Sequence, residues 1–379
     1  MVDYDAVIVG GGLSGLSLAA HLATSGWRDR SVLVVDDPDA RPAAQSWGFW
    51  ASGNGPLDAA VSRRYSQVRI RAGGVSRLLP LGRYEYRVVR RADLSGVVGV
   101  LLSRCPGYRV VEGTVEGVRG TGDGAAVTVD GQIVHCGWAF DSVTGPPAAT
   151  PVDARLAFTG WYVRCNRPVF DPATPVLFDF RTPQAGGCRF GYVRPDDPYA
   201  ALVELTAFVP RREPAPTPAD RAAALDRYLC DILRADDYAV LRTESAVLPL
   251  RTGPVRRVGG RVVAIGAAGG LVKATTGYAY TRIQRDSAAI ARSLVRHGHP
   301  WDIPRPARRY RMLDAVLLDV LDREPAQLER AFARLFAANP AERVLRFLDE
   351  DSRPRDDLRL IASLPPLPYL RAVARRYLT

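Results

Sequence analysis

Lysine and cysteine are both scarce in this chain of 379 residues. Only Lys273 among its 51 basic residues is a lysine, and its five cysteines lie too far apart for a metal-binding motif. We therefore predict reduced thiols, as in a cytoplasmic protein, and no metal site. The sequence has no run of about 18 uncharged apolar residues, which excludes a spanning helix. It also lacks a basic segment followed by an apolar one near its beginning, so no secretory signal is predicted.

The composition is typical of a folded protein of more than one domain. Hydrophobic residues make up 47% of the chain and charged residues 24%, which excludes a largely disordered protein. The formal net charge of +11 favours anionic partners such as membrane headgroups. Nucleic acid is not an expected partner, because the sequence has neither zinc-finger spacing nor an aromatic RNA-binding motif.

A dinucleotide-binding motif occupies the N-terminal segment. Residues 4–9 (YDAVIV) form a short apolar run typical of a buried parallel strand, and residues 10–15 (GGGLSG) fit the pattern G-x-G-x-x-G. A helix-like segment and a second strand follow, and this strand leads into an acidic residue. Such glycines let the backbone approach a pyrophosphate, and the acid accepts a hydrogen bond from a ribose hydroxyl. The motif fits FAD or NAD, and its early position favours FAD. The predicted contacts are Gly10, Gly12, Gly15 and Asp36.

A second glycine-rich segment far along the chain indicates an interrupted domain. Residues 261–265 (RVVAI) form another apolar strand, which runs into residues 266–270 (GAAGG). A strand-rich region precedes it, and a mostly helical remainder follows. This order predicts an α/β nucleotide domain whose first and last strands lie far apart in the sequence, with a β-rich lobe inserted between them.

Several short segments carry a family resemblance. They are residues 46–50 (SWGFW), 86–90 (YRVVR), 201–206 (ALVELT), 244–249 (ESAVLP), 266–270 (GAAGG), 275–278 (TTGY), 347–350 (FLDE) and 364–366 (LPP). In their order and spacing they resemble the flavin-dependent lycopene cyclase family, of the bacterial lycopene β-cyclase type, over nearly the whole chain.

The resemblance implies a fold like that of p-hydroxybenzoate hydroxylase. This is a Rossmann-type FAD-binding domain with an inserted antiparallel β-rich substrate lobe and a helical C-terminal region. We expect the FAD-binding domain at residues 1–45, 90–150 and 255–300, the substrate-binding lobe at 46–89 and 151–254, and a helical cap at 301–379.

The resemblance also implies an isomerase, an intramolecular lyase that closes the acyclic end groups of lycopene to β-ionone rings without net redox change. Reduced FAD is the implied cofactor, with NAD(P)H as the ultimate reductant, and the substrate is a hydrophobic isoprenoid. Three alternatives stay open: a cyclase of another linear terpenoid or meroterpenoid, a flavin monooxygenase or prenyl reductase on the same fold, and a carrier without catalysis. The ring type, the number of ends cyclised and the oligomeric state are not determined by the sequence.

Two acids are the candidate catalytic residues. Glu204 lies in an apolar strand, and a buried carboxylic acid can protonate an alkene or stabilise a cation. On a strand Leu202, Glu204 and Thr206 share one face. Some family members carry two adjacent acids here, whereas this chain has Leu205 at the second position. Glu244 is the second candidate, and its alternative interpretation is a solvated glutamate at a strand edge.

The remaining site predictions follow from the resemblance. Arg90, at the start of a predicted helix, is preferred to Arg91 as the arginine that reaches the pyrophosphate. The second set of FAD-contacting glycines is Gly266, Gly269, Gly270 and Gly277. The aromatic residues expected to line a polyene tunnel, or alternatively to pack in the core, are Trp47, Phe49, Trp50 and Trp161.

The helical tail predicts contact with a membrane. From about Arg305 onwards apolar residues recur at helical spacing among many arginines. Such a basic amphipathic surface can lie on a membrane that dissolves the substrate, or it can simply cap the substrate lobe. We expect a cytoplasmic protein that is peripheral on the inner face of the cell membrane.

Overall fold

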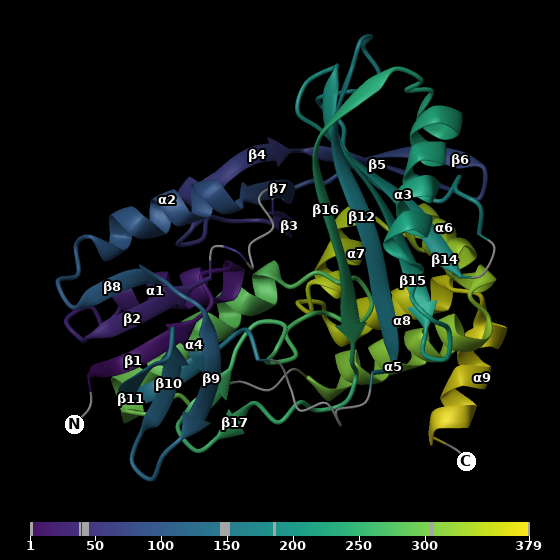
Figure 1. The fold of residues 1–379 in the computed structure, drawn as a ribbon. Helices are drawn as coiled ribbons and strands as arrows, with labels where there is room; N and C mark the ends of the chain where they lie inside the picture. Colours follow the sequence, from purple (N-terminus) through teal and green to yellow (C-terminus); the bar gives the residue numbers. More distant parts are fainter. Residues whose placement is uncertain are drawn as a thin grey trace.

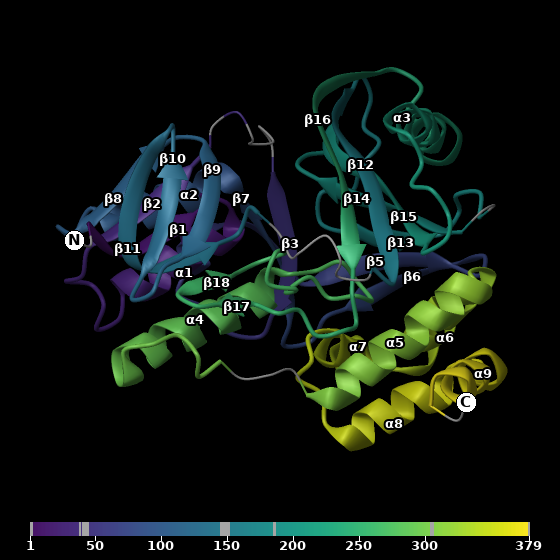
Figure 2. The ribbon, with the colours of Figure 1, turned by 60° about the horizontal axis from the view of Figure 1, so that its bottom comes forward.

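The computed structural model describes residues 3–37, 39, 45–144, 152–184, 187–303 and 307–377. Two sheet-containing bodies lie side by side, and the C-terminal helices pack against the second of them (Figure 1). A small three-stranded sheet lies between the two bodies (Figure 2). The predicted domain boundary at residues 150 and 151 lies outside the described residues.

The first body is built on a mostly parallel sheet in the order β17-β18-β11-β1-β2-β8. β9 and β10 form an antiparallel hairpin that extends from the first half of β11. The strands are β1 (Tyr4–Val9), β2 (Val32–Asp36), β8 (Tyr108–Glu112), β9 (Val115–Gly120), β10 (Ala125–Val129), β11 (Gln132–Asp141), β17 (Val258–Gly259) and β18 (Val262–Ala264).

Alternation along β1 gives this sheet two different buried faces. Ala6 and Ile8 pack into a core with three helices, and Val7 and Val9 pack against the β9–β10 hairpin. Both sides are covered, so β1 reads as a continuous apolar run in the sequence. The helices are α1 (Leu13–Ala23), α2 (Arg91–Leu102) and α4 (Tyr280–His297).

The second body is built on a seven-stranded sheet in the order β16-β12-β15-β14-β13-β5-β6. Its strands are β5 (Gln67–Ala72), β6 (Val75–Pro80), β12 (Ala154–Cys165), β13 (Val176–Asp179), β14 (Cys188–Pro195), β15 (Ala200–Pro210) and β16 (Tyr238–Leu250). The long antiparallel strands β12, β15 and β16 pair over nearly their whole length.

Helices cover one face of this sheet and part of the other. The helix α3 (Pro218–Arg227) and the π-helical turn η2 (Tyr228–Leu233) pack on one face with Val163, Val203 and Leu205. On the opposite face Phe178 contacts Phe332 of α6, with ring centroids 4.9 Å apart. The C-terminal helices are α5 (Arg308–Arg323), α6 (Ala326–Ala338), α7 (Ala341–Leu348), α8 (Pro354–Ser363) and α9 (Pro366–Tyr377). Within the described residues, no helix has the length and apolarity needed to cross a membrane.

The three-stranded sheet joins the two bodies. It contains β3 (Ser46–Ala51), β4 (Val61–Tyr65) and β7 (Glu85–Arg90), with the short 3-10 helix η1 (Asp58–Ala60) before β4. Phe49 and Val89 pack with the core of the first body, and Trp50 and Val88 pack with that of the second. The segment 46–89, which we expected to lie wholly in the substrate lobe, is therefore shared between the two cores.

Candidate active site

The first glycine motif forms an open helix N-terminus. Gly12 is the N-cap of α1, and an added Cβ there would have no described atom within 4 Å. The Cβ of an alanine at Gly15 would lie 1.9 Å from the carbonyl oxygen of Gly10, which forces close packing of β1 and α1. Unpaired N–H groups and the helix dipole at such a position favour a phosphate.

Asp36 and Arg91 fix the shape of this loop. The Gly11 N–H donates to Asp36 Oδ1 at 3.0 Å. Arg91 donates to Asp36 Oδ2 at 2.8 Å and to the Gly11 carbonyl at 2.9 Å. Arg90, the predicted contact, instead pairs with Asp196 at 3.1 Å. Arg90 ends a strand and Arg91 begins a helix, so the two side chains leave in different directions, and the geometry favours Arg91.

The second glycine motif packs against the first. Gly266 has φ +61°, and a Cβ there would meet the Ser14 hydroxyl at 2.0 Å. Gly277 has φ +73°, and its Cβ would meet Leu156 Cδ2 at 2.3 Å. These positions tolerate only glycine. A flat cofactor with a diphosphate fits this cradle, because its glycines let a ligand approach the backbone and its phosphate end is an open helix terminus.

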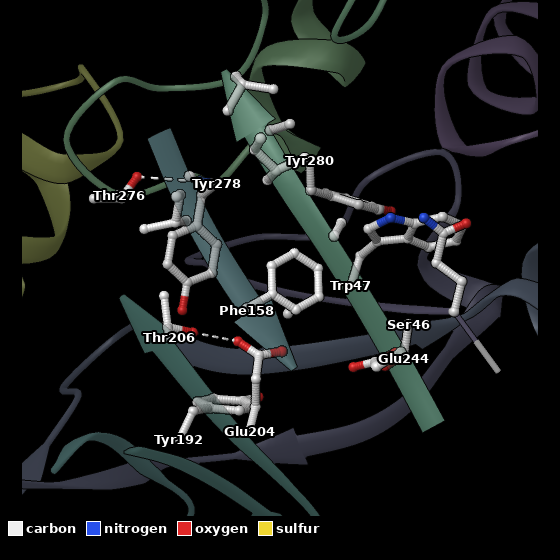
Figure 3. A pocket seen from close by; sticks show the side chains of 18 of the residues that line it. Ser46, Trp47, Phe158, Tyr192, Glu204, Thr206, Glu244, Thr276, Tyr278 and Tyr280 are labelled. Carbon is white, nitrogen blue, oxygen red and sulfur yellow. Dashed lines mark hydrogen bonds between the residues drawn. The ribbon is translucent and has the colours of Figure 1, made fainter. Parts of the chain in front are cut away.

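A cavity of about 420 Å³ adjoins both glycine motifs and the concave face of the seven-stranded sheet. Alternate residues of four strands supply its sheet wall. Figure 3 shows Glu204, Thr206 and Tyr192 on this wall, with Phe158, Tyr278 and Trp47 around the same space. The lining residues that alternate along these strands are Leu156, Phe158, Phe190, Tyr192, Arg194, Leu202, Glu204, Thr206, Glu244, Ala246 and Leu248, and Ser245 of β16 also borders the cavity.

The two predicted acids meet across a glycine. Gly160 on β12 pairs with Glu204 of β15 on one side and with Glu244 of β16 on the other. The Cβ of an alanine at position 160 would lie 3.1 Å from Glu244 Cγ, so the missing side chain lets the Glu244 side chain lie over Gly160. Neighbouring strands are about 4.8 Å apart, which places the two backbones roughly 10 Å apart with both side chains on one face.

The pKa of each acid is raised above its ordinary value. Burial raises the pKa of Glu204, although a hydrogen bond from the Thr206 hydroxyl at 2.6 Å and the charge of Arg194 oppose this rise. Burial, and then the charge of Glu204, raise the pKa of Glu244 to about 8. Two carboxyl groups so placed cannot both ionise easily, and a pair that shares one proton can donate and accept at neutral pH.

The predicted aromatic residues separate into three environments. Trp47 lines the cavity. Phe49 stacks on Tyr280 with ring centroids 3.8 Å apart, and the buried Trp50 donates its indole N–H to the Leu345 carbonyl at 3.2 Å. Trp161 packs on the opposite face of the sheet with the core under α3, because it alternates with Gly160. Only Trp47 of the four therefore lies along the cavity.

Sequence reasoning missed several cavity residues. Phe158, Tyr192 and Arg194 reach the cavity from strands beside Glu204, and Tyr278 reaches it from the loop after the second glycine motif. Tyr86 and Tyr192 share a hydrogen bond of 2.7 Å. A period of two along each strand marks which residues share a face, but only strand pairing says which strands are neighbours.

A family profile matches nearly the whole chain. The profile of a family described as "Lycopene cyclase protein" matches residues 5–374. Comparison with proteins of curated function gave no match.

Solved structures show the same fold at low sequence identity. A flavoprotein/dehydrogenase from Cytophaga hutchinsonii has 13% identity and a TM-score of 0.66, covering 98% of this chain and 100% of that one. A geranylgeranyl bacteriochlorophyll reductase-like protein from Thermoplasma acidophilum has 14% identity and a TM-score of 0.62, covering 99% and 96%. A probable FAD-dependent monooxygenase from Pseudomonas aeruginosa has 16% identity and a TM-score of 0.56, covering 86% and 96%. The predicted flavoprotein fold is confirmed.

Proposed function

The chain belongs to the lycopene cyclase family, and from this premise we propose that it closes the acyclic end group of a linear isoprenoid to a ring without net redox change. Lycopene, cyclised to β-ionone rings, is the first candidate substrate. The observation that carries the proposal is the pair of partly buried acids, Glu204 and Glu244, on one wall of an aromatic cavity beside the glycine motifs.

Cyclisation of an end group needs one proton delivered to a terminal double bond and a different proton removed from the ring carbon beside the cation. Glu244, with a pKa of about 8, is suited to hold the proton that is delivered. The Glu204 carboxylate, held by the Thr206 hydroxyl, is suited to face the cation and accept the proton that leaves. The pair ends with its proton on the other acid, and the total proton count is unchanged.

The carbocation needs stabilisation without a nucleophile. The faces of Trp47, Phe158 and Tyr278 border the cavity, and aromatic faces attract a cation. The rest of the sheet wall towards β13 is aliphatic and aromatic, so a bound hydrocarbon excludes water from the cation.

FAD is the cofactor that the two glycine motifs would hold. Gly12 and the N-terminus of α1 would face the diphosphate, and Gly266 and Gly277 would allow its close approach. In its reduced form the bound flavin would supply an electron-rich face beside the reacting end group, with NAD(P)H as the ultimate reductant. The isomerase outcome means that the flavin is not consumed.

A purified-protein assay tests the proposal. The protein is loaded with FAD, and the flavin is reduced chemically in the absence of oxygen. The protein is then incubated with lycopene in liposomes, and the products are separated and their masses measured by mass spectrometry. We expect ring-containing product of unchanged mass, reduced at least about 100-fold in E204Q and in E244Q. The exposed Glu213 provides a matched control, since E213Q should leave the rate unchanged.

Other products would favour other functions. Product heavier by two hydrogens would indicate a prenyl reductase, and product heavier by one oxygen a monooxygenase. If lycopene stays unchanged but a shorter terpenoid or a meroterpenoid is cyclised in the same assay, the proposed reaction is supported. The substrate is then another class of isoprenoid.

We also propose that the C-terminal helices rest on the inner face of the cell membrane. Leu367 and Leu370 of α9 are each 63% exposed, and Leu358 of α8 is 67% exposed. Arg371, Arg375 and Arg376 follow on α9 and pair with Glu324 and Asp319 of this chain, so the exposed leucines carry the proposal. Co-sedimentation with vesicles containing anionic lipid should fall at least fivefold in L367E/L370E. The exposed Val110 of the first sheet gives the control V110E, which should sediment like the wild type.

A further inference from the structure

A second row of polar residues lies beside the two acids. Leu202 on β15, two residues before Glu204, pairs with Tyr162 on β12 and with Arg194 on β14. Tyr162 in turn pairs with Arg242 on β16. Positions two apart on a strand share a face, so this row follows the acid row on the same face of the sheet, and its members Leu202 and Arg194 also line the cavity.

Arg194 is a buried cation that makes no ion pair with a carboxylate among the described residues, although the charge of Asp196, just after β14, also raises its pKa. Its side chain is 1% exposed. It donates to the Ser46 hydroxyl at 2.6 Å and to the Tyr162 hydroxyl, both neutral groups. Its Nε has no hydrogen-bond partner, and no carboxylate lies within 4.0 Å of it, in the part of the chain that the structure describes. Burying a guanidinium in this way is costly unless a negative charge nearby compensates it.

We propose that Arg194 is a positioning residue for the proton chemistry, whose buried charge keeps one of the two acids, Glu204 or Glu244, ionised while the other holds the proton. This inference deepens the proposed function and rests on it for the catalytic role of the pair. Arg194 acts through the acids and touches neither of them. With one proton on the pair, the remaining carboxylate and the guanidinium sum to zero charge, the least costly state for a cavity that binds a hydrocarbon.

The charges around the pair agree with this assignment. Arg194 opposes the rise in the pKa of both acids, and Arg242 opposes it at Glu244. Arg242 is exposed and lies over the Tyr162 ring at 4.2 Å, so water screens its charge. Among the described residues that line the cavity, the other titratable groups are the tyrosines Tyr86 of β7, Tyr192 of β14, Tyr278 of the glycine loop and Tyr280 of α4. Tyr162 of β12 accepts a hydrogen bond from Arg194, and the charge of Asp196, just after β14, raises the pKa of Arg194.

Leu205, the residue after Glu204 on β15, packs on the opposite face of the sheet under α3. The second acid of the cavity comes instead from β16, and the compensating charge comes from β14. Two acids on different strands do not have to share a proton. The buried charge of Arg194 favours the state in which one acid is ionised and the other is protonated.

Direct titration of the carboxyl groups tests the proposal without any need for turnover. Holoprotein labelled with 13C at the glutamate carboxyl carbons is titrated by NMR, and E204Q and E244Q assign the two resonances. In R194M we expect both titrations to move upwards by about one pH unit, because the ionised form loses its compensating charge. R194K should restore most of the shift.

Matched controls separate charge from packing. Y162F and S46A remove the hydrogen-bond partners of Arg194 and keep its charge, so they should leave both carboxyl titrations in place. In the cyclisation assay R194M should also move the pH optimum upwards and lower the rate at neutral pH about tenfold.

Three outcomes are decisive. Unmoved titrations in R194M would overturn the proposal, and so would equal shifts in R194M and Y162F, which would assign the effect to packing. If the titrations shift but the protein cyclises no isoprenoid, the link between Arg194 and the acids is supported. Only the proposed function is then overturned.

Discussion

Glu204 and Glu244 face the same residue, Gly160, from the two strands on either side of it. The acids are 40 residues apart in sequence and reach one cavity only because β12 lies between β15 and β16. This arrangement couples the two titrations, since the charge of Glu204 raises the pKa of Glu244.

Gly160 itself should be required for activity. A Cβ at this position would lie 3.1 Å from Glu244 Cγ and 3.1 Å from Leu202 Cδ1. A displacement of a few tenths of an ångström changes the orientation of the Glu244 carboxyl group relative to the substrate. G160A should therefore slow cyclisation, and G160V, with its branched side chain, should slow it at least about tenfold. FAD content and cyclisation rate are measured together. An added Cβ at Gly53 meets open space, so G53A serves as the control, and wild-type rates in G160V would contradict the assignment.

The cyclisation rate should fall as the pH rises through about 8. The raised pKa of Glu244 means that its carboxyl group is protonated below about pH 8 and ionised above it, and only the protonated form can start the reaction. We expect about a tenfold loss for each further pH unit on the alkaline side. Initial rates between about pH 6 and pH 10 check this, with FAD occupancy followed at each pH. A flat profile up to the alkaline limit would exclude Glu244 as the donor.

Arg91 should matter more than Arg90 for cofactor binding. R91A removes charge-assisted hydrogen bonds to Asp36 and Gly11, which shape the loop at the N-terminus of α1. Such bonds contribute about 1.5 kcal/mol, so FAD affinity should fall about tenfold. R90A breaks only a half-exposed pair with Asp196 and should change the affinity less than about twofold. Titration of the apoprotein with FAD, followed by flavin fluorescence, measures both, and the reverse order of effects would restore Arg90 as the contact.

The single lysine should be important for stability. Lys273 is buried and donates to Asp314 at 3.0 Å and to Glu350 at 3.1 Å, which ties the second glycine loop to the C-terminal helices. K273M leaves two buried carboxylates with less positive charge, so the free energy of unfolding should fall by about 3 kcal/mol.

Denaturant unfolding of K273M and of a surface control measures that loss. Arg83 makes an ion pair of 3.0 Å with Glu342 at an exposed site, and R83M should lower the free energy of unfolding by less than about 1 kcal/mol. Equal losses in the two variants would show that the buried ion pairs of Lys273 stabilise the fold no more than an exposed ion pair does.

Some of the site could be predicted from residues that are close together in the chain. The strand, glycine loop, helix and acid of residues 4–36 are local, and the structure places them as a connected unit. The choice between Arg90 and Arg91 was beyond sequence reasoning, because it depends on where β7 ends and α2 begins. The role of Trp161 was equally beyond it, because a shift of one residue along a strand exchanges the two faces of a sheet.

The sequence by itself determined the flavoprotein fold, the family and the choice of both acids as candidate catalytic residues. Glycine motifs, apolar strand patterns and short family segments in a set order can all be read from the linear chain. Only the tertiary structure decided that Glu204 and Glu244 form a pair across Gly160 and that Arg194 lies in the next row beside them. The physical reason is that strand order and register bring together residues far apart in sequence, and these contacts set the burial and charge on which a carboxyl group's pKa depends.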